Sequence, residues 1–358
     1  MRSWSWVLLI VFAIAIKFIA SHPFWVEAHY SSGIYPLISK VQRAIFGWVP
    51  FSLGDVLYAF IGLIVCVKTG QLIKTLLKKQ VNRHYLLIGL RQLLFFFLFL
   101  YVTFYAFWGL NYSRQGIDYQ LSLDIKEINI QDADTLTGLL QQRLNYFANL
   151  VNEAERDSFN RKKNLFEKAN EAFLYAANSQ SFLSYTPPSI KPSLFSYAGN
   201  YLGFQGYYNA FSGEAQVNTT IPRCLEPFVT VHEIAHQLGY AKESDANFIA
   251  FIACKSLPEN SFQYSMYLDL YNYAQSELFQ KDSLLAISYQ NKLHPQALMD
   301  FEECRVFYQR HQNPVEVMIT WLYGSFLKAN NQPEGKRSYS RVINFLVAYY
   351  KKYGKEAI

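Results

Sequence analysis

Two histidines and a glutamate in the second half of the chain have the spacing of a zinc-hydrolase motif. His232, Glu233 and His236 form the pattern H-E-x-x-H. On a helix the two histidines lie on one face, so both imidazoles can reach one ion. Glu233 is displaced by about 100° around the helix axis, so its carboxylate can lie beside a metal-bound water without ligating the metal. We therefore predict a Zn²⁺ site with His232 and His236 as ligands and Glu233 as the general base.

A third ligand is needed, and the chain after the motif limits the choice. Glu243 follows His236 by seven residues, so on an unbroken helix it would lie roughly 10 Å further along the axis, too far to share an ion. Gly239 is placed to end the helix with a positive φ and to turn the chain back. We expect a second helical stretch, 244–254, and Glu243 as the third ligand. Asp245 is the competing ligand, and the alternative to a metal site is an exposed helix without a ligand.

Further residues are predicted to contact a substrate. Tyr323, Lys328 and Tyr339 lie around a polar break late in the chain, and their side chains have the chemistry to stabilise an oxyanion. The segment just before the motif is predicted to be an edge strand, to which a peptide could add by backbone hydrogen bonds. An ordinary scaffold strand is the alternative for this segment. Its residues are Gly213, Glu214, Ala215, Gln216, Val217 and Asn218.

Composition separates the chain into an apolar first third and a polar remainder. The 358 residues are 17% aromatic and carry a formal charge of +6, and much of the basic excess lies beside apolar runs. The charge therefore indicates membrane topology, and no basic tract supports nucleic-acid binding. The cysteines contain no C-x-x-C pair, so a cysteine zinc site is not expected. A disulfide between two of Cys224, Cys254 and Cys304 is compatible with the sequence, which does not say which two.

Three apolar runs predict three membrane spans within residues 1–112. They lie at about 4–20, 51–69 and 92–111, and each is long enough to cross a hydrocarbon core of about 30 Å. The first run could also be a signal peptide, but no clear cleavage site follows it, so we expect a retained helix. Residues 21–50 are predicted to be a mixed, aromatic loop along the membrane surface. The alternative reading of the runs, buried core helices, fits poorly because polar positions are so few.

The basic residues predict the orientation of these spans. The connector 70–84 carries Lys74, Lys78, Lys79 and Arg83, so the positive-inside rule places it in the cytoplasm. Everything after the third span then lies outside the cytoplasm. Residues 113–134 are predicted to be a polar linker, and 135–358 a single domain with helical apolar spacing in most of its length. Short strands are expected only at 204–218, with the motif helix near 226–238.

The arrangement of motifs resembles an uncharacterised family of bacterial membrane proteins. The resemblance rests on segments 191–196, 206–218, 231–247 and 323–335 and covers nearly the whole chain. It implies three N-terminal spans in the inner membrane and a zincin-like α+β domain outside the cytoplasm, with a small sheet and the H-E-x-x-H helix. The family itself has no established activity.

The stretch from Glu243 to Asn247 is similar to the E-x-x-x-D segment of gluzincin peptidases. In that group the glutamate is the third zinc ligand and the aspartate orients a ligand histidine. The resemblance therefore implies that Glu243 is the ligand and that Asn247 takes the place of the aspartate. A neutral amide raises the basicity of a ligand less than a carboxylate does. Lys242 stands where metzincins have a third histidine, and a protonated lysine cannot ligate a metal.

These observations predict a membrane-anchored zinc metallopeptidase. Its substrate would be a peptide or protein outside the cytoplasm, and its other partner is the lipid bilayer. Two alternatives stay open: a catalytically silent zincin-fold protein with a binding or sensor role, and a zinc amidase that acts on a non-peptide amide of the cell envelope. The motif specifies activation of water and not the shape of the substrate.

Overall fold

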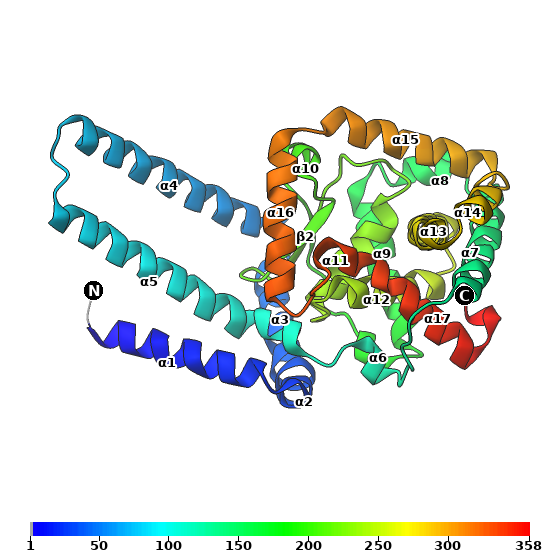
Figure 1. The fold of residues 1–358 in the computed structure, drawn as a ribbon, viewed down its shortest axis with the longest axis horizontal. Coiled ribbons are helices and arrows are strands. Elements are labelled where there is room, and N and C mark those ends of the chain that lie inside the picture. The colour runs from blue at the N-terminus through cyan, green and yellow to red at the C-terminus, as the bar shows by residue number, and fades with distance from the viewer. Residues whose placement is uncertain (1–2) are drawn as a thin grey trace.

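Helices form most of the chain, and long N-terminal helices extend from one side of a larger helical domain (Figure 1). The computed structural model describes residues 3–358, apart from the side chains of residues 3, 336 and 337. The prediction of a mainly helical chain with one small sheet is confirmed. The N-terminal elements are α1 (Ser3–Ala20), α2 (Pro23–Trp25), a π-helix (Val26–Ile34), α3 (Tyr35–Phe46), α4 (Leu53–Leu77) and α5 (Arg83–Phe107).

The remaining helices build the domain around a small sheet. Before the sheet come a 3-10 helix (Gly109–Ser113), α6 (Ile117–Gln120), α7 (Ile130–Leu150), α8 (Glu153–Ser158), α9 (Lys162–Ala177) and a 3-10 helix (Ser181–Leu183). Helix α10 (Ser196–Leu202) lies between the first two strands. After the sheet come α11 (Glu226–Gln237), α12 (Glu243–Ser256), α13 (Asn260–Lys281), α14 (Ser283–Gln290), α15 (Pro295–His311), α16 (Pro314–Ala329), a 3-10 helix (Gly335–Arg341), α17 (Val342–Tyr353) and a 3-10 helix (Lys355–Ala357).

Two to three helices are long and apolar enough to span a membrane. They are α4 and α5, with a third span if α1 is joined to the helices that follow it at a bend of 97°. The helices extend beyond the predicted spans 51–69 and 92–111 at the connector, because α4 continues to Leu77 and α5 begins at Arg83. Residues such as Lys, Gln and Leu favour a helix even where the sequence is no longer apolar. The basic connector is therefore short, and most of its charges lie on the helix ends.

The predicted loop at 21–50 is helical and packs on the domain. Tyr35, Ser39, Gln42 and Arg43 of α3 are buried, and they share one helix face at spacings of three and four residues. Three of these four side chains are polar, so the buried face shows no apolar period in the sequence. Hydrogen bonds take the place of apolar packing on this face. The guanidinium of Arg43, for example, donates from Nε to the carbonyl of Pro187 at 2.8 Å.

The segment 113–134 is also packed and is not a free linker. Ile117, Leu121, Leu123 and Ile128 are buried in the main core of the domain. Arg114 forms a buried ion pair with Glu27 of the π-helix at 2.7 Å. This segment therefore joins the N-terminal helices to the domain through fixed contacts.

The sheet has three strands in the order β1-β3-β2. Strand β1 (Ile190–Pro192) runs parallel to β3 (Glu214–Val217), and β2 (Gly206–Asn209) pairs with β3 in antiparallel fashion. The prediction that 213–218 is an edge strand is wrong, because β3 is the central strand. The proline-rich segment at 187–192 contributes β1, which occupies the edge that we expected to be open. Strand β2 is the edge strand that lies nearer to the motif helix.

Helix α11 is at the centre of the domain, and all of its residues are buried. It packs against β2, β3, α9, α12 and α13. The main core surrounds it on one side, and a second cluster of buried side chains lies on the other side. This second cluster includes Tyr35, Trp108 and Ala241, so it joins α3 and the end of α5 to the chain just after α11.

Candidate metal centre

Helix α11 holds the two motif histidines on one face. It begins with Pro227 in its first turn, where the missing N–H of proline costs no hydrogen bond. His232 and His236 follow one turn apart, with ring centroids 4.7 Å from each other. Both residues are more than nine-tenths buried. The helix therefore presents two imidazoles to the same small space.

A turn at Gly239 brings the chain back over this space. The backbone of Gly239 has φ of 87°, which glycine adopts without strain. A Cβ atom at this position would lie only 2.7 Å from Cε1 of Tyr35. Arg114 fixes the turn from outside, because its Nη1 donates to the carbonyl of Gly239 at 3.1 Å. Helix α12 then begins at Glu243, one residue before the predicted stretch.

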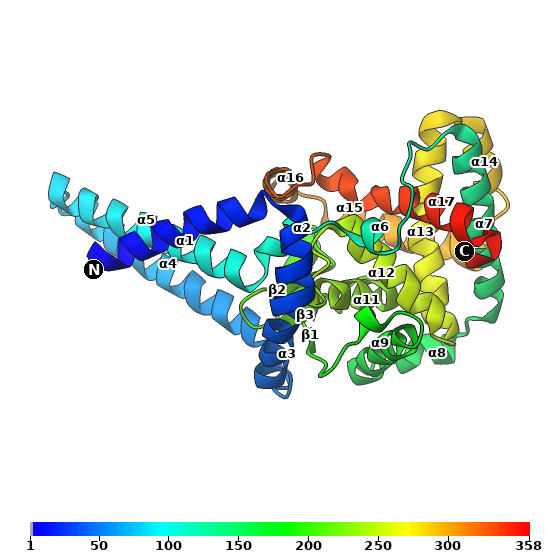
Figure 2. The ribbon, with the colours of Figure 1, turned by 90° about the horizontal axis from the view of Figure 1, so that it is seen from below.

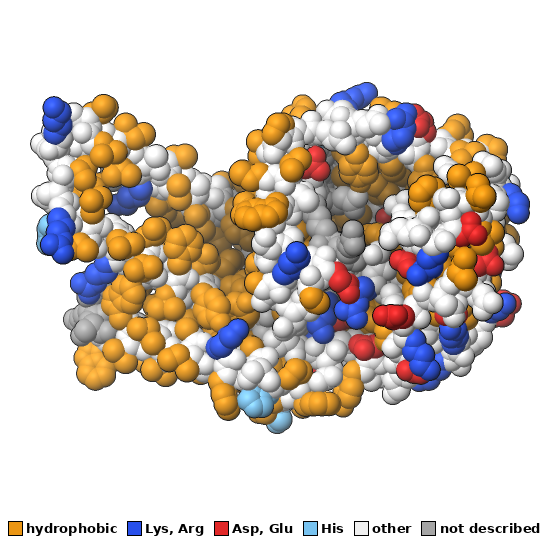
Figure 3. Space-filling model, viewed as in Figure 1, with side chains coloured by type: hydrophobic (Ala, Val, Ile, Leu, Met, Phe, Trp, Pro, Cys, Tyr) orange, Lys and Arg blue, Asp and Glu red, His pale blue; other side chains and the backbone are white. Residues whose placement is uncertain are grey.

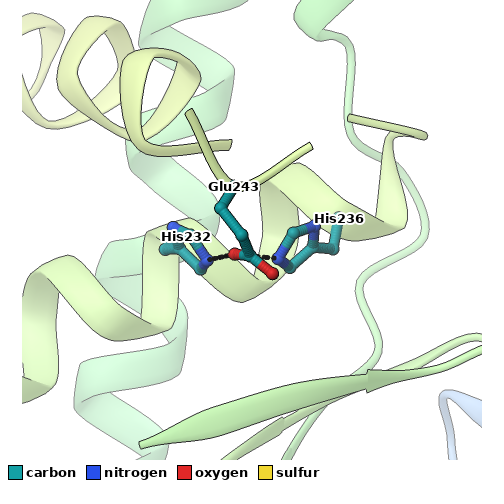
Figure 4. A group of neighbouring side chains, drawn as sticks. All are labelled: His232, His236 and Glu243. Atoms are coloured by element: carbon teal, nitrogen blue, oxygen red, sulfur yellow. Dashed lines mark ion pairs between the residues drawn. The ribbon is translucent and has the colours of Figure 1, made fainter. Parts of the chain in front are cut away.

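The turn places the carboxylate of Glu243 between the two imidazoles (Figure 4). Its Oε2 atom is 3.2 Å from Nε2 of His232 and 3.4 Å from Nε2 of His236. Ligand atoms of one zinc ion lie about 3–4 Å apart, since each metal–ligand bond is about 2 Å long. Within the described residues these three form the only group of three or more His, Cys, Asp and Glu side chains with metal-ligand spacing.

Hydrogen bonds on the far side of each ring aim the Nε2 atoms at Glu243. Nδ1 of His236 lies 2.7 Å from the carbonyl of Tyr240, so this nitrogen carries a proton in both forms of the ring, and Nε2 has the free lone pair once the imidazole is neutral. The side chain of Asn247 is hydrogen bonded to His232. Nδ2 of Asn247 donates to the carbonyl of Tyr339 at 3.2 Å, which leaves its oxygen for the imidazole. Asn247 therefore lies beside His232, and its role in orienting that ring stays a prediction from the resemblance.

The donor set fits a cation of the zinc class. The Oε2 atom of Glu243 is buried, and its neighbours among the described residues are the two Nε2 atoms, which offer it no proton once both imidazoles are neutral. Atoms that face a common point in this way are satisfied by an ion at that point. Two imidazole nitrogens and one carboxylate oxygen form the ligand set of catalytic zinc sites that keep one position for water.

Burial and mutual charge shift the pKa values of the three side chains in different directions. Burial opposes the charge on His236, but the carboxylate of Glu243 outweighs it and raises the pKa of His236 to about 9. Burial lowers the pKa of His232, which is therefore neutral near pH 7. Burial raises the pKa of Glu243, but the neighbouring imidazoles reverse this and hold it below its usual value. The metal-free cluster is thus an imidazolium–carboxylate pair beside a neutral imidazole.

Glu233 points toward strand β2 and not into the ligand cluster. A Cβ atom at Gly206 of β2 would lie 2.5 Å from Oε1 of Glu233, so only glycine leaves room for the carboxylate there. The other carboxylate oxygen, Oε2, is buried and has no hydrogen-bond partner among the described residues. Burial raises the pKa of Glu233 to about 8. Such a group can take up and release a proton near neutral pH.

Two of the three predicted oxyanion residues lie at the cluster. The hydroxyl of Tyr323 donates to Oε1 of Glu243 at 2.6 Å, so this tyrosine holds the third side chain of the cluster. The ring of Tyr339 is stacked on His232 at 6.2 Å between centroids. Burial raises the pKa of Tyr339 well above its ordinary value, and the charge of Glu243 adds to the shift. Lys328 is exposed, with Cε near Gly335, and is not at the cluster.

Asp245 does not join the cluster as the competing ligand. Its carboxylate faces the turn before α6, where Cβ of an alanine at Gly116 would lie 3.1 Å from Oδ2. The backbone of Ile117 donates a hydrogen bond to it. Burial raises the pKa of Asp245 to about 6. The prediction of Asp245 as an alternative ligand is therefore wrong in this structure.

The strand that was predicted to bind the substrate, β3, is bonded to the start of the long apolar helix α4. Glu214 accepts hydrogen bonds from the backbone N–H groups of Leu53 and Gly54 at 3.1 and 2.6 Å, at the first turn of α4. Gln216 donates to the hydroxyl of Ser52, the N-cap of α4. Both side chains are completely buried. The residues of β3 therefore attach α4 to the sheet and are not free to pair with a peptide.

Several residues around the cluster carry no local signal in the sequence. The indole of Trp108 donates from Nε1 to the carbonyl of His236 at 3.0 Å. Tyr35 and Ser39 donate to the carbonyl of Gln237 at 2.8 and 2.7 Å. The side-chain oxygen of Gln332 accepts from the backbone N–H of Glu243 at 3.1 Å. These contacts join segments more than 80 residues apart, so spacing along the chain does not reveal them.

Comparison with known proteins gives a family but no relative of known activity. A family model described as "Protein of unknown function (DUF3810)" matches residues 30–347. No curated protein matches the chain. No solved structure matches it either.

Proposed function

The chain belongs to the DUF3810 family of proteins of unknown function, and we propose that it is a membrane-anchored zinc metallopeptidase. The observation that carries the proposal is the buried convergence of His232, His236 and Glu243, with Glu233 on the same helix as the two histidines. Histidines alone would support only metal binding. The adjacent carboxylate with a raised pKa is the feature that favours hydrolysis.

Each residue of the cluster then has a defined task. His232, His236 and Glu243 would hold Zn²⁺, which lowers the pKa of a bound water and polarises the scissile carbonyl. Glu233 takes the proton of the attacking water and passes it to the leaving amine. The hydroxyl of Tyr339 stays protonated, because burial raises its pKa, and it can donate to the developing oxyanion.

Strand β2 replaces β3 as the proposed site for the substrate backbone. It is an edge strand of the sheet, and its residue Gly206 contacts the carboxylate of Glu233. A peptide that adds to this edge by backbone hydrogen bonds would pass directly beside the general base. The lack of a side chain at Gly206 favours such a close approach.

The charges at the ends of the spans support a location of the domain outside the cytoplasm. Lys74, Lys78, Lys79 and Arg83 gather at the turn between α4 and α5, at the end away from the domain (Figure 3). By the positive-inside rule this turn is cytoplasmic. The domain would then lie on the opposite face of the membrane, which in a bacterium is the outer face of the inner membrane.

One observation favours a second candidate, a zinc-binding protein without turnover. His232, Glu233, His236 and Glu243 are each at most 8% exposed, and α16 and the 3-10 helix Gly335–Arg341 supply the tyrosines that cover them. A peptide can reach the cluster only if this cover moves. A silent zincin-fold protein needs no such movement.

Metal content and peptide cleavage of three purified proteins separate the two candidates. We expect wild type to bind zinc and to cleave peptides from a mixed library. Glu233→Gln should bind zinc but fail to cleave, and Glu243→Gln should lose most of its zinc. Equal cleavage by wild type and Glu233→Gln would contradict the role of Glu233. Zinc in wild type without turnover of any peptide would favour the silent protein or an amidase for another class of amide.

A further inference from the structure

Helix α16 has two different faces. One face covers the metal centre, where Tyr323 binds Glu243 and Leu327 is fully buried. The opposite face is apolar and exposed, with Val317 and Trp321 each 68% exposed and Met318 and Leu322 about half exposed. No charged residue lies between Glu316 and Lys328. A soluble surface rarely leaves so many large apolar side chains in contact with water on one helix.

The position of α16 places this face next to the spans. Phe326 packs against Phe104 of α5 with ring centroids 6.2 Å apart. Asn330, just after α16, accepts a hydrogen bond from the hydroxyl of Tyr105 at 2.5 Å. In Figure 1 α16 runs across the ends of α4 and α5, and Figure 2, turned by 90°, shows it nearly end-on. The helix therefore runs across the spans at the end where they meet the domain.

Helix α3 repeats this arrangement at the same junction. Leu37, Val41 and Ile45 form an exposed apolar stripe at spacings of four residues, and Trp48 continues it just past the helix. The opposite face carries Tyr35 and Ser39, which bind the end of α11. The helices that include α3 turn from α1 by 97°. A helix at this angle to a span lies in the plane of the membrane.

We propose that α3 and α16 lie in the surface of the lipid bilayer, with their apolar faces inserted beside the spans. The proposal rests on the membrane anchoring in the proposed function but not on peptidase activity. An in-plane helix with one apolar face, and with tryptophan among its anchors, has the composition of an interfacial membrane helix. The apolar surface of the spans also continues onto the domain in Figure 3.

The same contacts connect the bilayer to the metal centre. Helix α16 binds lipid on one face and holds Glu243 through Tyr323 on the other. It cannot move away from the cluster without withdrawing its apolar face from the lipid. The bilayer therefore supports the cover over the site, and a substrate reaches the metal close to the membrane surface.

Quenching of Trp321 fluorescence tests the position of α16. The full chain is placed in phosphatidylcholine nanodiscs, and the signal lost in Trp321→Phe gives the contribution of Trp321. We expect brominated acyl chains to quench this contribution and aqueous acrylamide to leave most of it. The control is Leu284→Trp in the Trp321→Phe background, because Leu284 is 79% exposed on α14, at the far end of the domain. Its added fluorescence should respond to acrylamide only.

Two results would overturn the proposal. Quenching of Trp321 by acrylamide and not by brominated lipid would show that α16 faces water. Protection of Trp321 from both quenchers would show that a second copy of the chain or another protein covers it. Neither result depends on cleavage, so a failure here is separate from a failure of the peptidase assay.

Hydrogen exchange of α16 in the same nanodiscs provides a second readout. A charge at Met318 would be driven out of the lipid, so Met318→Glu should speed exchange in 314–329 when lipid is present. Leu284→Glu adds the same charge to a site that is more exposed than Met318, and it should leave exchange in α16 unchanged. Unchanged exchange in Met318→Glu would contradict insertion of this face.

Discussion

At the residue scale, the side chains around the cluster decide how well it can hold a metal. Tyr323 donates to one oxygen of Glu243, which leaves the other oxygen to face the two imidazoles. We predict that Tyr323→Phe lowers zinc affinity by roughly 10–100-fold, as is typical when a partner of a ligand is lost. Competition with a chelator of known affinity measures the change. Tyr197→Phe is the control, since Tyr197 is 68% exposed on α10, and equal affinities of the two variants would contradict the role of Tyr323.

Protons must leave the cluster before a metal can bind, which gives a prediction about pH. The pKa of His236 in the metal-free protein is raised to about 9, above the ordinary 6.5. The imidazolium–carboxylate pair therefore makes its full contribution to the stability of the metal-free protein below about pH 6.5. This contribution is lost as the pH rises through about 9. Zinc needs the neutral imidazole, so binding at pH 7 should release roughly one proton from His236.

Calorimetry in buffers of different ionisation enthalpy measures this proton release. The Glu233→Gln variant is the best protein for it, because it removes the other nearby group whose pKa is raised into this range. We expect zinc affinity to increase with pH up to about 9 and the proton release to disappear above that pH. Binding at pH 7 without any dependence on the buffer would show that His236 is already neutral.

At the element scale, local signals predicted the helices and strands near the motif, but not the partners of these elements. The spacing of His232 and His236, the glycine after them and the acidic start of the next helix are all visible in sequence. Strand order is not, because the pairing of β3 with β1 depends on chain closure over the segment between them. The role of α3 was missed for another reason. Its buried face is polar, and a polar face has no hydrophobic period.

The turn at Gly239 connects these elements and gives a further prediction. In Gly239→Ala the new Cβ would meet the ring of Tyr35 at 2.7 Å, and φ of 87° is strained for alanine. Strain of this kind costs about 1–3 kcal/mol. We expect lower thermal stability and lower zinc affinity, because Glu243 is displaced with the turn.

A second glycine variant separates the effect of backbone strain from the effect of displacing Glu243. Gly354 also has a positive φ of 91°, but a Cβ there would have no atom within 4 Å, and the residue lies past α17 near the C-terminal end. Gly354→Ala should therefore lose stability through backbone strain alone and bind zinc as wild type does. If Gly239→Ala also keeps its zinc affinity, the turn does not position the third ligand.

At the scale of the whole molecule, the long apolar helices, α3 and the domain that holds the His232–His236–Glu243 cluster meet at one junction around α11. The end of α5 contacts His236 through Trp108, and α3 contacts the last residue of α11. Sequence analysis assigned the spans and the metal site to separate ranges of the chain. The spans were predicted from apolar runs and the site from the spacing of its motif, and neither pattern reports contacts between the two ranges. Contacts between the two regions are long-range, and they combine hydrogen bonds with a cluster of buried apolar and aromatic side chains. The membrane region is thus part of the support of the site and not a detachable anchor.

The redox state of two cysteines can test on which side of the membrane the domain lies. Sγ of Cys224 lies 3.7 Å from Sγ of Cys304, and both thiols are buried. Disulfides form in extracytoplasmic compartments, where oxidants accept the two electrons and two protons of a thiol pair. We predict that Cys224 and Cys304 are joined in protein from its native membrane, which a mass lower by two hydrogen atoms would reveal. Cys254 is buried alone and should stay reduced.

Labelling of an introduced cysteine separates the chemistry of this pair from the orientation of the chain. A membrane-impermeant maleimide should label Ser283→Cys in sealed right-side-out vesicles, because α14 lies on the domain. It should label Gln80→Cys, in the turn between α4 and α5, only in inside-out vesicles. Label on Gln80→Cys in right-side-out vesicles, together with free thiols at Cys224 and Cys304, would place the metal centre in the cytoplasm. Free thiols with the expected labelling pattern would instead show that burial protects the pair from oxidation, because a buried thiol rarely becomes the reactive thiolate.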